Sequence, residues 1–335
     1  MMQLNRHDVS RRAVLSGLAM GMIADEFRGT AHAAIINLVV VGKDGWLFPV
    51  WDEVRRIDVK RIHQVASVLA DAVEILKQAN VQVAIALLPA KSRVYREFLP
   101  EDFKFSAEPE RRYALALEEL RRSGVLVPDL ATPLINLRAA PPNDALFFKA
   151  DTHWTATGAA YSATELARQI KEKVRLPPAP QGGARLAPPV TVVHEKNDLV
   201  ALLPAADAAN YPLQKYSVRR ALQPQGKTAL VDDDTADVAV VGNSFMQPNF
   251  GFVTTLSNQL DRPVSLTWRI HQVGPYRTLL SYVGSAPFRR LRPKLIVWSL
   301  LETDMTMPSD RRDSWGQNAM PAQAFLGELR QAAAG

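Results

Sequence analysis

An aspartate and a histidine two positions apart are the first candidates for chemistry in this sequence. They lie in the run Asp151-Thr152-His153-Trp154. In an extended segment the side chains of residues i and i+2 point the same way, so the carboxylate of Asp151 can reach Nδ1 of His153. That contact would fix the imidazole tautomer and stabilise its cation. The pair could instead bind a metal or only stabilise a loop, but no further cluster completes a coordination set, so we expect no metal and no other cofactor.

A serine that directly follows an apolar run is the second candidate. The run Val238 to Val241 continues into Gly242-Asn243-Ser244-Phe245. A serine just beyond a buried parallel strand is presented at the carboxyl edge of the sheet, and the glycine permits a sharp turn. A helix that starts after Ser244 would direct backbone N–H groups at a developing oxyanion. The alternative is that Ser244 only caps a helix, which is a common use of serine.

The order of these residues along the chain separates two classes of serine enzyme. In an ordinary α/β-hydrolase the serine comes first, within a G-x-S-x-G turn, and the acid and histidine follow. Here the aspartate and histidine precede Ser244, and Met246 stands where that turn requires glycine. The glycine-rich motifs of nucleotide-binding loops are also missing from the sequence. An ordinary α/β-hydrolase and a nucleotide-dependent enzyme are therefore disfavoured.

The other histidines are weaker candidates. His271 follows the strand-like run Val264 to Ile270, so it stands at a strand end, where sites often form, and we keep it in reserve. His63 lies within a helical pattern and is expected to be a surface or packing residue. His194 lies in an irregular stretch and is expected at the surface.

Strand-like and helix-like segments alternate along the chain and must position these residues. Helical spacing of apolar residues predicts helices, and continuous apolar runs predict buried strands. The expected helices are Lys60 to Asn80, Pro109 to Ser123, Thr155 to Val174 with Thr155 as N-cap, and Pro321 to Ala334. The expected strands are Ile35 to Val41, Val81 to Leu88, Val125 to Val127, Val238 to Val241, Val264 to Ile270 and Leu295 to Leu300, whereas Thr191 to Gln225 fits no pattern. The alternation predicts an α/β fold, a three-layer α/β/α sandwich around a mainly parallel sheet, in one domain over residues 34–335.

Residues 1–33 have the features of an export signal. Ser10-Arg11-Arg12 begins a positive region, an apolar stretch from Ala13 to Ala24 follows, and Ala31-His32-Ala33 is an A-x-A cleavage pattern. The paired arginines are typical of the twin-arginine signal, which exports folded proteins across the bacterial inner membrane. We predict a periplasmic protein that is cut before Ala34. Acidic residues close to the cleavage pattern, Asp25 and Glu26, leave open a form that stays tethered to the inner membrane.

The composition suits an exported globular enzyme. The 335 residues include no cysteine, and the formal net charge is +6. Zinc–thiolate, iron–sulfur and cysteine-nucleophile chemistry are therefore excluded, and no thiol can mispair in an oxidising compartment. The positive charge forms no Lys/Arg block, so we expect no nucleic-acid partner. No stretch approaches the roughly 18 apolar residues of a membrane span.

Together the motifs resemble the alginate O-acetyltransferase family that includes AlgJ and AlgX. The run from Gly42 to Phe48, GKDGWLF, resembles the family's opening motif. Asp151-Thr152-His153-Trp154 and Gly242-Asn243-Ser244-Phe245 match its D-T-H-W and G-x-S-F signatures. Lys91 and Tyr95 resemble its P-x-K-x-x-x-Y segment. The resemblance spans most of the chain after residue 33.

The resemblance implies an SGNH-hydrolase-like fold whose catalytic blocks are permuted along the chain. Ser244 would be the nucleophile, His153 the general acid and base, and Asp151 the carboxylate that orients His153. Gly274, Lys91 and Tyr95 are further candidates for contacts to the oxyanion or the substrate. No asparagine is a convincing oxyanion donor.

The resemblance also implies a reaction and its partners. An acetyl group would pass to hydroxyls of a secreted exopolysaccharide, alginate or a similar polymer. A membrane acyltransferase would supply it to a protein peripheral to the inner membrane. A periplasmic acetyl esterase with the same triad, or a non-catalytic scaffold of an export complex, are the alternatives. Near Trp298 the family has W-E-x-x-E-R, but here Ser299 and Thr303 replace two charged residues, which leaves donor and polymer open.

Overall fold

A four-stranded parallel sheet forms the centre of the protein, which was analysed as a computed structural model. The structure describes residues 35–36, 38–139, 144–179, 181–222 and 236–335. The sheet order is β4 (Gln82–Leu88), β9 (Leu295–Leu301), β7 (Val238–Gly242) and β8 (Val264–Trp268), and every neighbouring pair is parallel. These strands are near-continuous apolar runs because both faces of a parallel sheet are buried.

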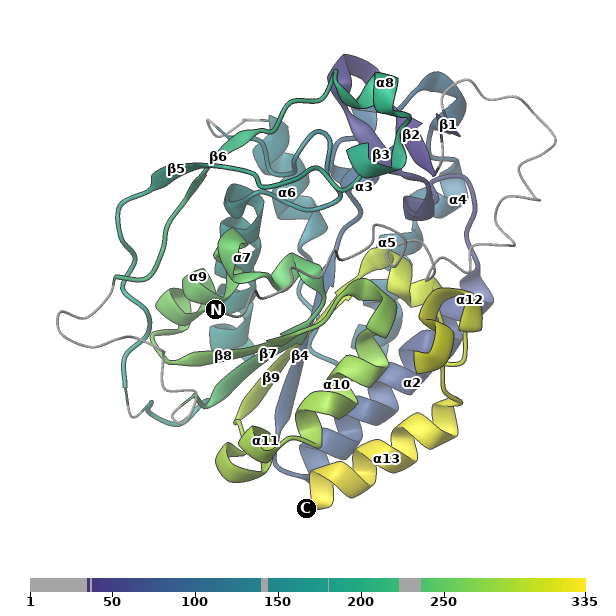
Figure 1. Ribbon diagram of the computed structural model, residues 1–335. Helices are drawn as coiled ribbons and strands as arrows, with labels where there is room; N and C mark the ends of the chain where they lie inside the picture. Colours follow the sequence, from purple (N-terminus) through teal and green to yellow (C-terminus); the bar gives the residue numbers. More distant parts are fainter. Residues whose placement is uncertain (1–34, 37, 140–143, 180, 223–235) are drawn as a thin grey trace, which may run out of the picture.

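Helices cover both faces of this sheet, as Figure 1 shows. Along β7, Val238 and Val240 belong to one core while Ala239 and Val241 belong to the other, as the two-residue period of a strand requires. The first core is completed by α7 (Ala156–Lys173) and α9 (Phe252–Leu260). The second is completed by α2 (Val59–Gln78), α5 (Arg112–Arg122), α10 (Pro275–Val283), α11 (Ala286–Leu291) and α13 (Ala322–Ala334). The predicted three-layer α/β/α sandwich is confirmed.

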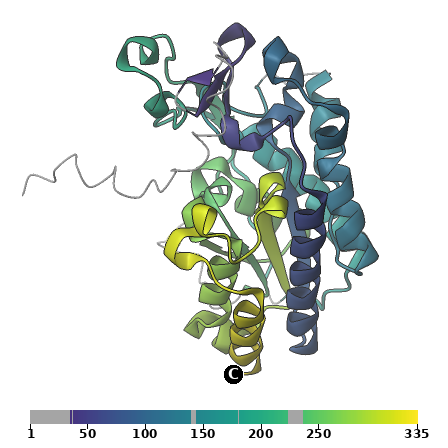
Figure 2. The same cartoon turned by 90° about the vertical axis from the view of Figure 1, so that its right-hand side faces the viewer.

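Two small antiparallel sheets are added to the sandwich. One consists of β1 (Ile35–Ile36), β2 (Val39–Val41) and β3 (Leu47–Pro49). The other pairs β5 (Val190–Val193) with β6 (Lys215–Val218). The first of these sheets lies at the end of the molecule away from the C-terminus, which is plain in the side view of Figure 2. The parallel strands run toward that same end, so their carboxyl edge faces it.

Short helices fill the connections between the longer elements. The α-helical ones are α3 (Lys91–Val94), α4 (Ala107–Glu110), α6 (Ala131–Ala139), α8 (Ala205–Ala208) and α12 (Arg312–Trp315). The 3₁₀ turns are η1 (Lys43–Gly45), η2 (Val50–Asp52), η3 (Arg96–Phe98), η4 (Glu101–Phe103), η5 (Val200–Leu202), η7 (Ser244–Met246), η8 (Pro248–Phe250), η9 (His271–Val273), η10 (Glu302–Thr306) and η11 (Gly316–Asn318).

Most expected elements form, and the exceptions have local causes. The helix expected over 109–123 is divided at Arg111, whose N–H donates to the carbonyl of Glu108, three residues back instead of four. The strand expected over 35–41 folds back as a hairpin, with Leu38 at a φ of 73°. The strand expected over 125–127 makes a single bridge, from Leu126 to Ala84. The stretch without a sequence pattern contains the β5–β6 ribbon.

The predicted export signal, residues 1–33, lies outside the described residues. Within the part of the chain that the structure describes, no helix combines the length and apolar character needed to cross a membrane.

Candidate active site

Ser244 lies in a tight turn at the carboxyl end of β7. Gly242 ends the strand, and a Cβ there would come within 2.7 Å of Cβ of Ser299 and 2.8 Å of Cγ of Met246, so only glycine fits. Oδ1 of Asn243 then accepts a hydrogen bond from the N–H of Phe245 at 3.0 Å. The helix expected directly after Ser244 is a single 3₁₀ turn, η7, with Asn243 as its N-cap, and the α-helix α9 begins only at Phe252.

Asp151 and His153 lie in a closed loop that leads into α7. The loop is tied at its base by the N–H of Thr155, which donates to the carbonyl of Leu146 at 2.9 Å. Oδ1 of Asp151 accepts from the backbone N–H of His153 at 2.9 Å and contacts its Nδ1 at 2.7 Å. The two side chains therefore meet through a turn stabilised by the aspartate itself, and not through the extended segment expected from the sequence.

The structure brings Asp151, His153 and Ser244 together as a hydrogen-bonded chain. Nε2 of His153 lies 2.8 Å from Oγ of Ser244, while Nδ1 faces Asp151. The buried indole of Trp154 links the two segments, since its Nε1 donates to the carbonyl of Phe245 at 2.9 Å. Asp151 is 1% exposed, whereas His153 and Ser244 are partly open to solvent. This is the arrangement in which an imidazole can take a proton from a hydroxyl.

Electrostatics keep Asp151 in its charged form. Burial alone would raise the pKa of Asp151, but the hydrogen bonds and charge of His153 and the close imidazole of His194 outweigh it and hold that pKa well below its ordinary value. Burial and the charge of Asp151 instead raise the pKa of Asp198, whose Oδ1 accepts from the N–H of Thr152. A permanent charge on Asp151 is what stabilises an imidazolium at His153.

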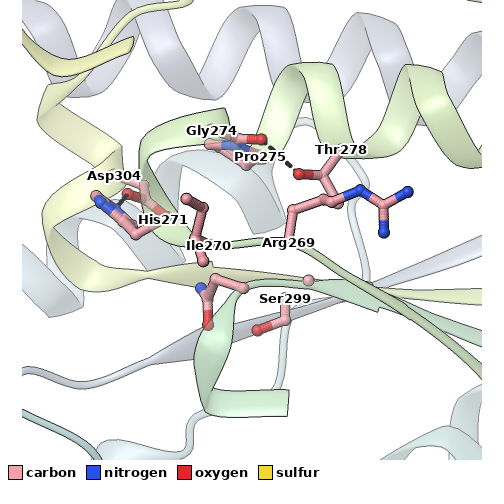
Figure 3. A pocket seen from close by; sticks show the side chains of 10 residues that line it. Arg269, Ile270, His271, Gly274, Pro275, Thr278, Ser299 and Asp304 are labelled. Atoms are coloured by element: carbon pink, nitrogen blue, oxygen red, sulfur yellow. Dashed lines mark hydrogen bonds and ion pairs between the residues drawn. The ribbon is translucent and has the colours of Figure 1, made fainter. Parts of the chain in front are cut away.

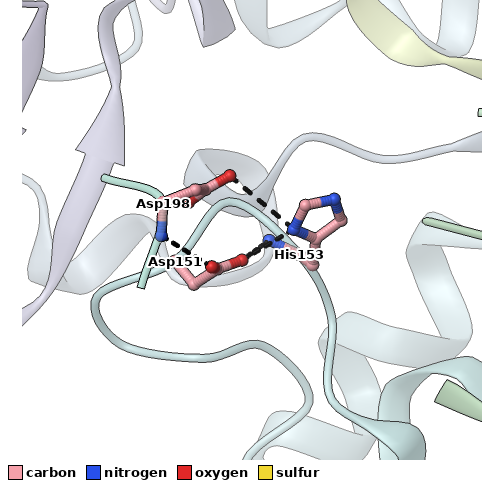
Figure 4. Close-up of side chains that lie close together, drawn as sticks. All are labelled: Asp151, His153 and Asp198. Carbon is pink, nitrogen blue, oxygen red and sulfur yellow. Dashed lines mark hydrogen bonds and ion pairs between the residues drawn. The ribbon is translucent and has the colours of Figure 1, made fainter. Parts of the chain in front are cut away.

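One group among the described residues has the donor types and closeness to surround a metal ion. It consists of Asp151, His153 and Asp198, drawn in Figure 4. Oδ2 of Asp198 lies 3.7 Å from Nδ1 of His153, and the N–H of Asp198 donates to Oδ2 of Asp151 at 2.8 Å. A cation among these atoms would break the 2.7 Å contact between Asp151 and His153. The donor atoms are therefore better explained as parts of the hydrogen-bonded chain to Ser244.

The buried ammonium of Lys91 binds the backbone of the Asp151 loop. Its Nζ donates to the carbonyl oxygens of Leu47 (2.5 Å), Lys149 (2.8 Å) and Asp151 (2.9 Å). Burial lowers the pKa of Lys91 to about 7, but three acceptors match the three N–H bonds of an ammonium, so we assign the charged form. Lys91 was expected to contact the oxyanion or the substrate. Its ammonium instead binds carbonyls of β3 and of the Asp151 loop.

Tyr95 and Gly274 also occupy supporting places. The hydroxyl of Tyr95 accepts from the N–H of Leu146 at 2.8 Å, at the base of the same loop. The N–H of Gly274 donates to the carbonyl of His271 at 2.9 Å, so that N–H is not directed at Ser244. Gly274 has a φ of 79°, and a Cβ there would meet the ring of Trp315 at 2.9 Å. These contacts explain a tyrosine and a glycine by packing and backbone geometry.

A small pocket with room for about one water molecule, partly open to solvent, adjoins the turn that holds Ser244 (Figure 3). Gly242, Asn243, Ser299 and the reserve candidate His271 line it. Nε2 of His271 contacts Oδ1 of Asp304 at 2.9 Å. Burial would lower the pKa of His271, but the charge and hydrogen bond of Asp304 outweigh it and raise that pKa. The hydroxyl of Ser299 is buried and has no hydrogen-bond partner among the described residues.

His194 is the site residue that sequence reasoning missed. It was expected at the surface, but it is only 6% exposed, and its Nε2 lies 3.1 Å from Oδ2 of Asp151. The β-branched run Val190 to Val193 just before it is the signal that could have placed it at a strand end. The expectation for His63 is confirmed: it is half exposed on α2 and pairs with Glu119.

Comparison with known proteins places the chain in a family. A family model described as "SGNH hydrolase-like domain, acetyltransferase AlgX" matches residues 39–302. The chain belongs to this family. Its membership confirms the resemblance, the SGNH-like α/β fold and the acetyltransferase class expected from the sequence.

Individual relatives agree with this assignment. A protein of Pseudomonas putida described as "Probable alginate O-acetylase AlgJ" is 29% identical over 285 residues, which cover 81% of this chain and 71% of that protein. The protein of the same description from Pseudomonas aeruginosa is 28% identical, with the same coverage.

Solved structures show the same fold. The O-acetyltransferase domain of Pseudomonas putida AlgJ superposes with a TM-score of 0.68 at 25% identity, covering 88% of this chain and 98% of that domain. Pseudomonas aeruginosa AlgX superposes with a TM-score of 0.61 at 22% identity, covering 86% of this chain and 65% of that structure.

Proposed function

We propose that this acetyltransferase-family protein transfers acetyl groups to hydroxyls of a secreted exopolysaccharide, alginate or a similar polymer, through an acyl-enzyme on Ser244. The observation that carries the proposal is the continuous contact from Ser244 Oγ to His153 Nε2 (2.8 Å) and from His153 Nδ1 to Asp151 (2.7 Å). The names of the curated relatives, which refer to alginate O-acetylation, support the class of substrate.

The first half-reaction loads the enzyme. Oγ of Ser244 attacks the carbonyl carbon of the acetyl donor, and its proton moves to Nε2 of His153. The bond to the donor's leaving oxygen then breaks, and His153 returns the proton to that oxygen. In the second half a sugar hydroxyl attacks the acetyl carbon, loses its proton to His153, and Ser244 leaves with that proton restored. Asp151 stays ionised throughout and stabilises the imidazolium of each step.

The oxyanion of each tetrahedral intermediate needs N–H donors close to Ser244. In the nucleophile turn the N–H of Phe245 donates to Asn243 Oδ1, and those of Met246 and Gln247 donate to the carbonyls of Asn243 and Ser244. The N–H of Ser244 is then the group of this turn that an oxyanion can use.

The decisive measurement uses a chromogenic acetyl ester with and without an added oligosaccharide, followed by intact mass. We expect acetyl transfer to the sugar and a transient acetyl adduct that is lost in Ser244→Ala, while the exposed control Ser123→Ala behaves as wild type. Hydrolysis unaffected by sugar would identify an esterase with the same triad. Full polymer acetylation in cells that carry Ser244→Ala would contradict both enzymes and favour a scaffold. We expect turnover to be unchanged when a chelator is added. Loss of turnover on adding the chelator would contradict a triad that needs no metal.

The place of action is part of the same proposal. The paired Arg11 and Arg12 support twin-arginine export to the periplasm, where a membrane acyltransferase would hand over the acetyl group. We expect the double variant Arg11→Lys, Arg12→Lys to remain in the cytoplasm in cell fractionation. N-terminal sequencing of the exported protein is expected to begin at Ala34. An intact N-terminus in the membrane fraction would instead support the tethered form.

A further inference from the structure

A second histidine faces the aspartate of the triad from the opposite side. Nε2 of His194 lies 3.1 Å from Oδ2 of Asp151, the oxygen that does not contact His153. Neither ring nitrogen of His194 has a well-aligned hydrogen-bond partner among the described residues, although both are buried. If His194 only filled space, its burial would cost folding free energy, because two ring nitrogens lose their water and gain no better partner than this carboxylate. An apolar side chain would pack there without that cost.

The two oxygens of Asp151 serve different neighbours. Oδ1 contacts both the backbone N–H and Nδ1 of His153. Oδ2 accepts from the N–H of Asp198 at 2.8 Å and faces His194. If either contact on Oδ2 is lost, the carboxylate can rotate about its Cβ–Cγ bond, which turns the oxygen facing His153 out of line with Nδ1. The orientation that presents Oδ1 to His153 therefore depends on what holds Oδ2.

The β5–β6 ribbon places His194 in this position. His194 directly follows β5, and its backbone N–H donates to the carbonyl of Gln214, which directly precedes β6. The side chain of Gln214 in turn accepts from the N–H of Lys149 in the Asp151 loop. The imidazole of His194 stacks on Phe148 with ring centroids 3.9 Å apart and planes 9° apart. Packing thus leaves the ring little freedom beside Asp151.

We propose that His194 is a positioning residue of the acyl-transfer site, which holds Oδ2 of Asp151 so that Oδ1 stays on His153. This inference rests on the proposed function, because it assigns a role only if Asp151 orients a catalytic His153. His194 does not touch the reacting atoms and acts through Asp151 alone. The titratable groups in contact with it are Asp151 on the loop and Tyr216 on β6, and Asp151 in turn contacts His153 and the N–H of Asp198.

Three substitutions separate positioning from packing. His194→Phe keeps the stack on Phe148 but removes the N–H. His194→Gln places an amide N–H near the position of Nε2, within reach of Asp151. His194→Asn carries the same amide but is one bond shorter, so it falls short of that carboxylate. His63→Phe, on the exposed face of α2, is the matched control for histidine loss.

The measurement is the pH profile of kcat and KM of the full protein on a chromogenic acetyl ester. We expect His194→Phe and His194→Asn to lower kcat by about tenfold to a hundredfold at unchanged KM, the range for losing a hydrogen bond to a charged group. His194→Gln should recover most of the rate. The acidic limb of kcat/KM should move to lower pH in the Phe and Asn variants, because a misoriented Asp151 stabilises the imidazolium of His153 less.

Specific outcomes would overturn the inference. Wild-type kcat and pH profile in His194→Phe would show that the ring only fills space. If His194→Gln and His194→Asn lose kcat equally and the acidic limb of kcat/KM does not move, the defect is one of general packing. If the acidic limb of kcat/KM moves to higher pH in His194→Phe, the charge of His194 had been neutralising that of Asp151. If His194→Phe does not fold, the Gln and Asn pair still decides. Retained activity in Ser244→Ala would instead overturn the proposed function, whatever His194 does.

Discussion

The contacts of Asp151 explain how a single carboxylate can both stabilise its loop and take part in the proposed catalysis. Its Oδ1 stabilises the turn by accepting the N–H of His153, and the same oxygen contacts the ring Nδ1. The tautomer of His153 follows from this contact: the proton sits on Nδ1 and Nε2 is left to accept from Ser244. Charge, not shape alone, is the property of Asp151 that an acyl transfer requires.

Asp151→Asn tests that requirement directly. The amide keeps the size of the side chain and an oxygen acceptor, but it lacks the charge that stabilises the imidazolium. By analogy with the aspartate of serine proteases, we expect kcat on a chromogenic acetyl ester to fall by roughly 10³- to 10⁴-fold, with a small change in KM. Asp71→Asn, at an exposed position of α2, should leave kcat unchanged. A loss below tenfold in Asp151→Asn would remove Asp151 from the triad.

What could be predicted at the scale of residues was local in the sequence. Asp151 and His153 are two positions apart, and Ser244 follows an apolar strand, so short-range rules were enough to select them. His194 could not be selected, because its contact with Asp151 is tertiary. Lys91 was selected by resemblance, but its bonds to three carbonyl oxygens depend on segments far apart in the chain. Side-chain roles that depend on tertiary contacts are the part the sequence does not specify.

At the scale of elements, the loop from Leu146 to Thr155 is the part that the rest of the fold must hold in place. It touches α3 through Lys91, the nucleophile turn through Trp154, and the β5–β6 ribbon through Lys149. The strands of the main sheet were predictable because burial on both faces makes them continuous apolar runs. The β5–β6 ribbon lacks that signal, since Val190 and Val193 are both exposed, and only its β-branched residues indicate a strand.

Lys91→Met is expected to loosen this loop. It removes the ammonium that lies over the rings of Trp46 and Phe48 and donates to three carbonyl oxygens, of which that of Lys149 still accepts from the N–H of Leu47 at 2.8 Å. Each buried polar group left unsatisfied costs about 1–3 kcal/mol, so for the carbonyls of Leu47 and Asp151 we expect the free energy of unfolding to fall by about 2 kcal/mol or more. Because one of these carbonyls belongs to Asp151, kcat should fall as well. Urea denaturation and ester turnover measure both effects.

The control for this variant is Lys77→Met, which removes an exposed ammonium at the end of α2. It is expected to change stability by less than about 0.5 kcal/mol and to keep wild-type kcat. Normal stability and normal turnover in Lys91→Met would show that the carbonyl oxygens accept hydrogen bonds from other donors. Lys91 would then not be needed to stabilise the loop.

At the scale of the whole molecule, a buried ionic network joins parts of the chain that are distant in sequence. Glu302, after β9, contacts Arg93 of α3 at 2.6 Å and Arg112 of α5 at 2.9 Å, and all three side chains are buried. Arg112 also donates to the carbonyls of Asp52 and Glu53 in the N-terminal part of the fold. The carboxylate of Asp52 accepts from the N–H of Ser92, next to Lys91. The support beneath the active site is therefore charged.

Two carboxylates of this network give stability opposite dependences on pH. Burial would raise the pKa of Glu302, but the charges of Arg112 and Arg93 outweigh it and lower that pKa to about 2 from 4.5. Its contribution, about 3 kcal/mol, is present above pH 4.5 and is lost as pH falls toward 2. Burial raises the pKa of Asp52 to about 6 from 3.8. Between pH 6 and 3.8 the carboxyl of Asp52 is protonated in the folded state but ionised in the unfolded state. The free energy of unfolding therefore rises by about 3 kcal/mol as pH falls from 6 to 4.

The two effects together predict greatest stability near pH 4 to 5 and a decline on both sides. We expect the free energy of unfolding from urea denaturation to be higher at pH 5 than at pH 7.5, and to fall again at pH 3. Asp52→Asn keeps an acceptor for Ser92 but cannot ionise, so its stability should change less between pH 7.5 and 5 than that of the wild type. The raised pKa of His271 adds a change in the same direction to both proteins and cancels in this comparison. Equal slopes in the two proteins would mean that Asp52 is charged without penalty, because water or Arg112 compensates its burial.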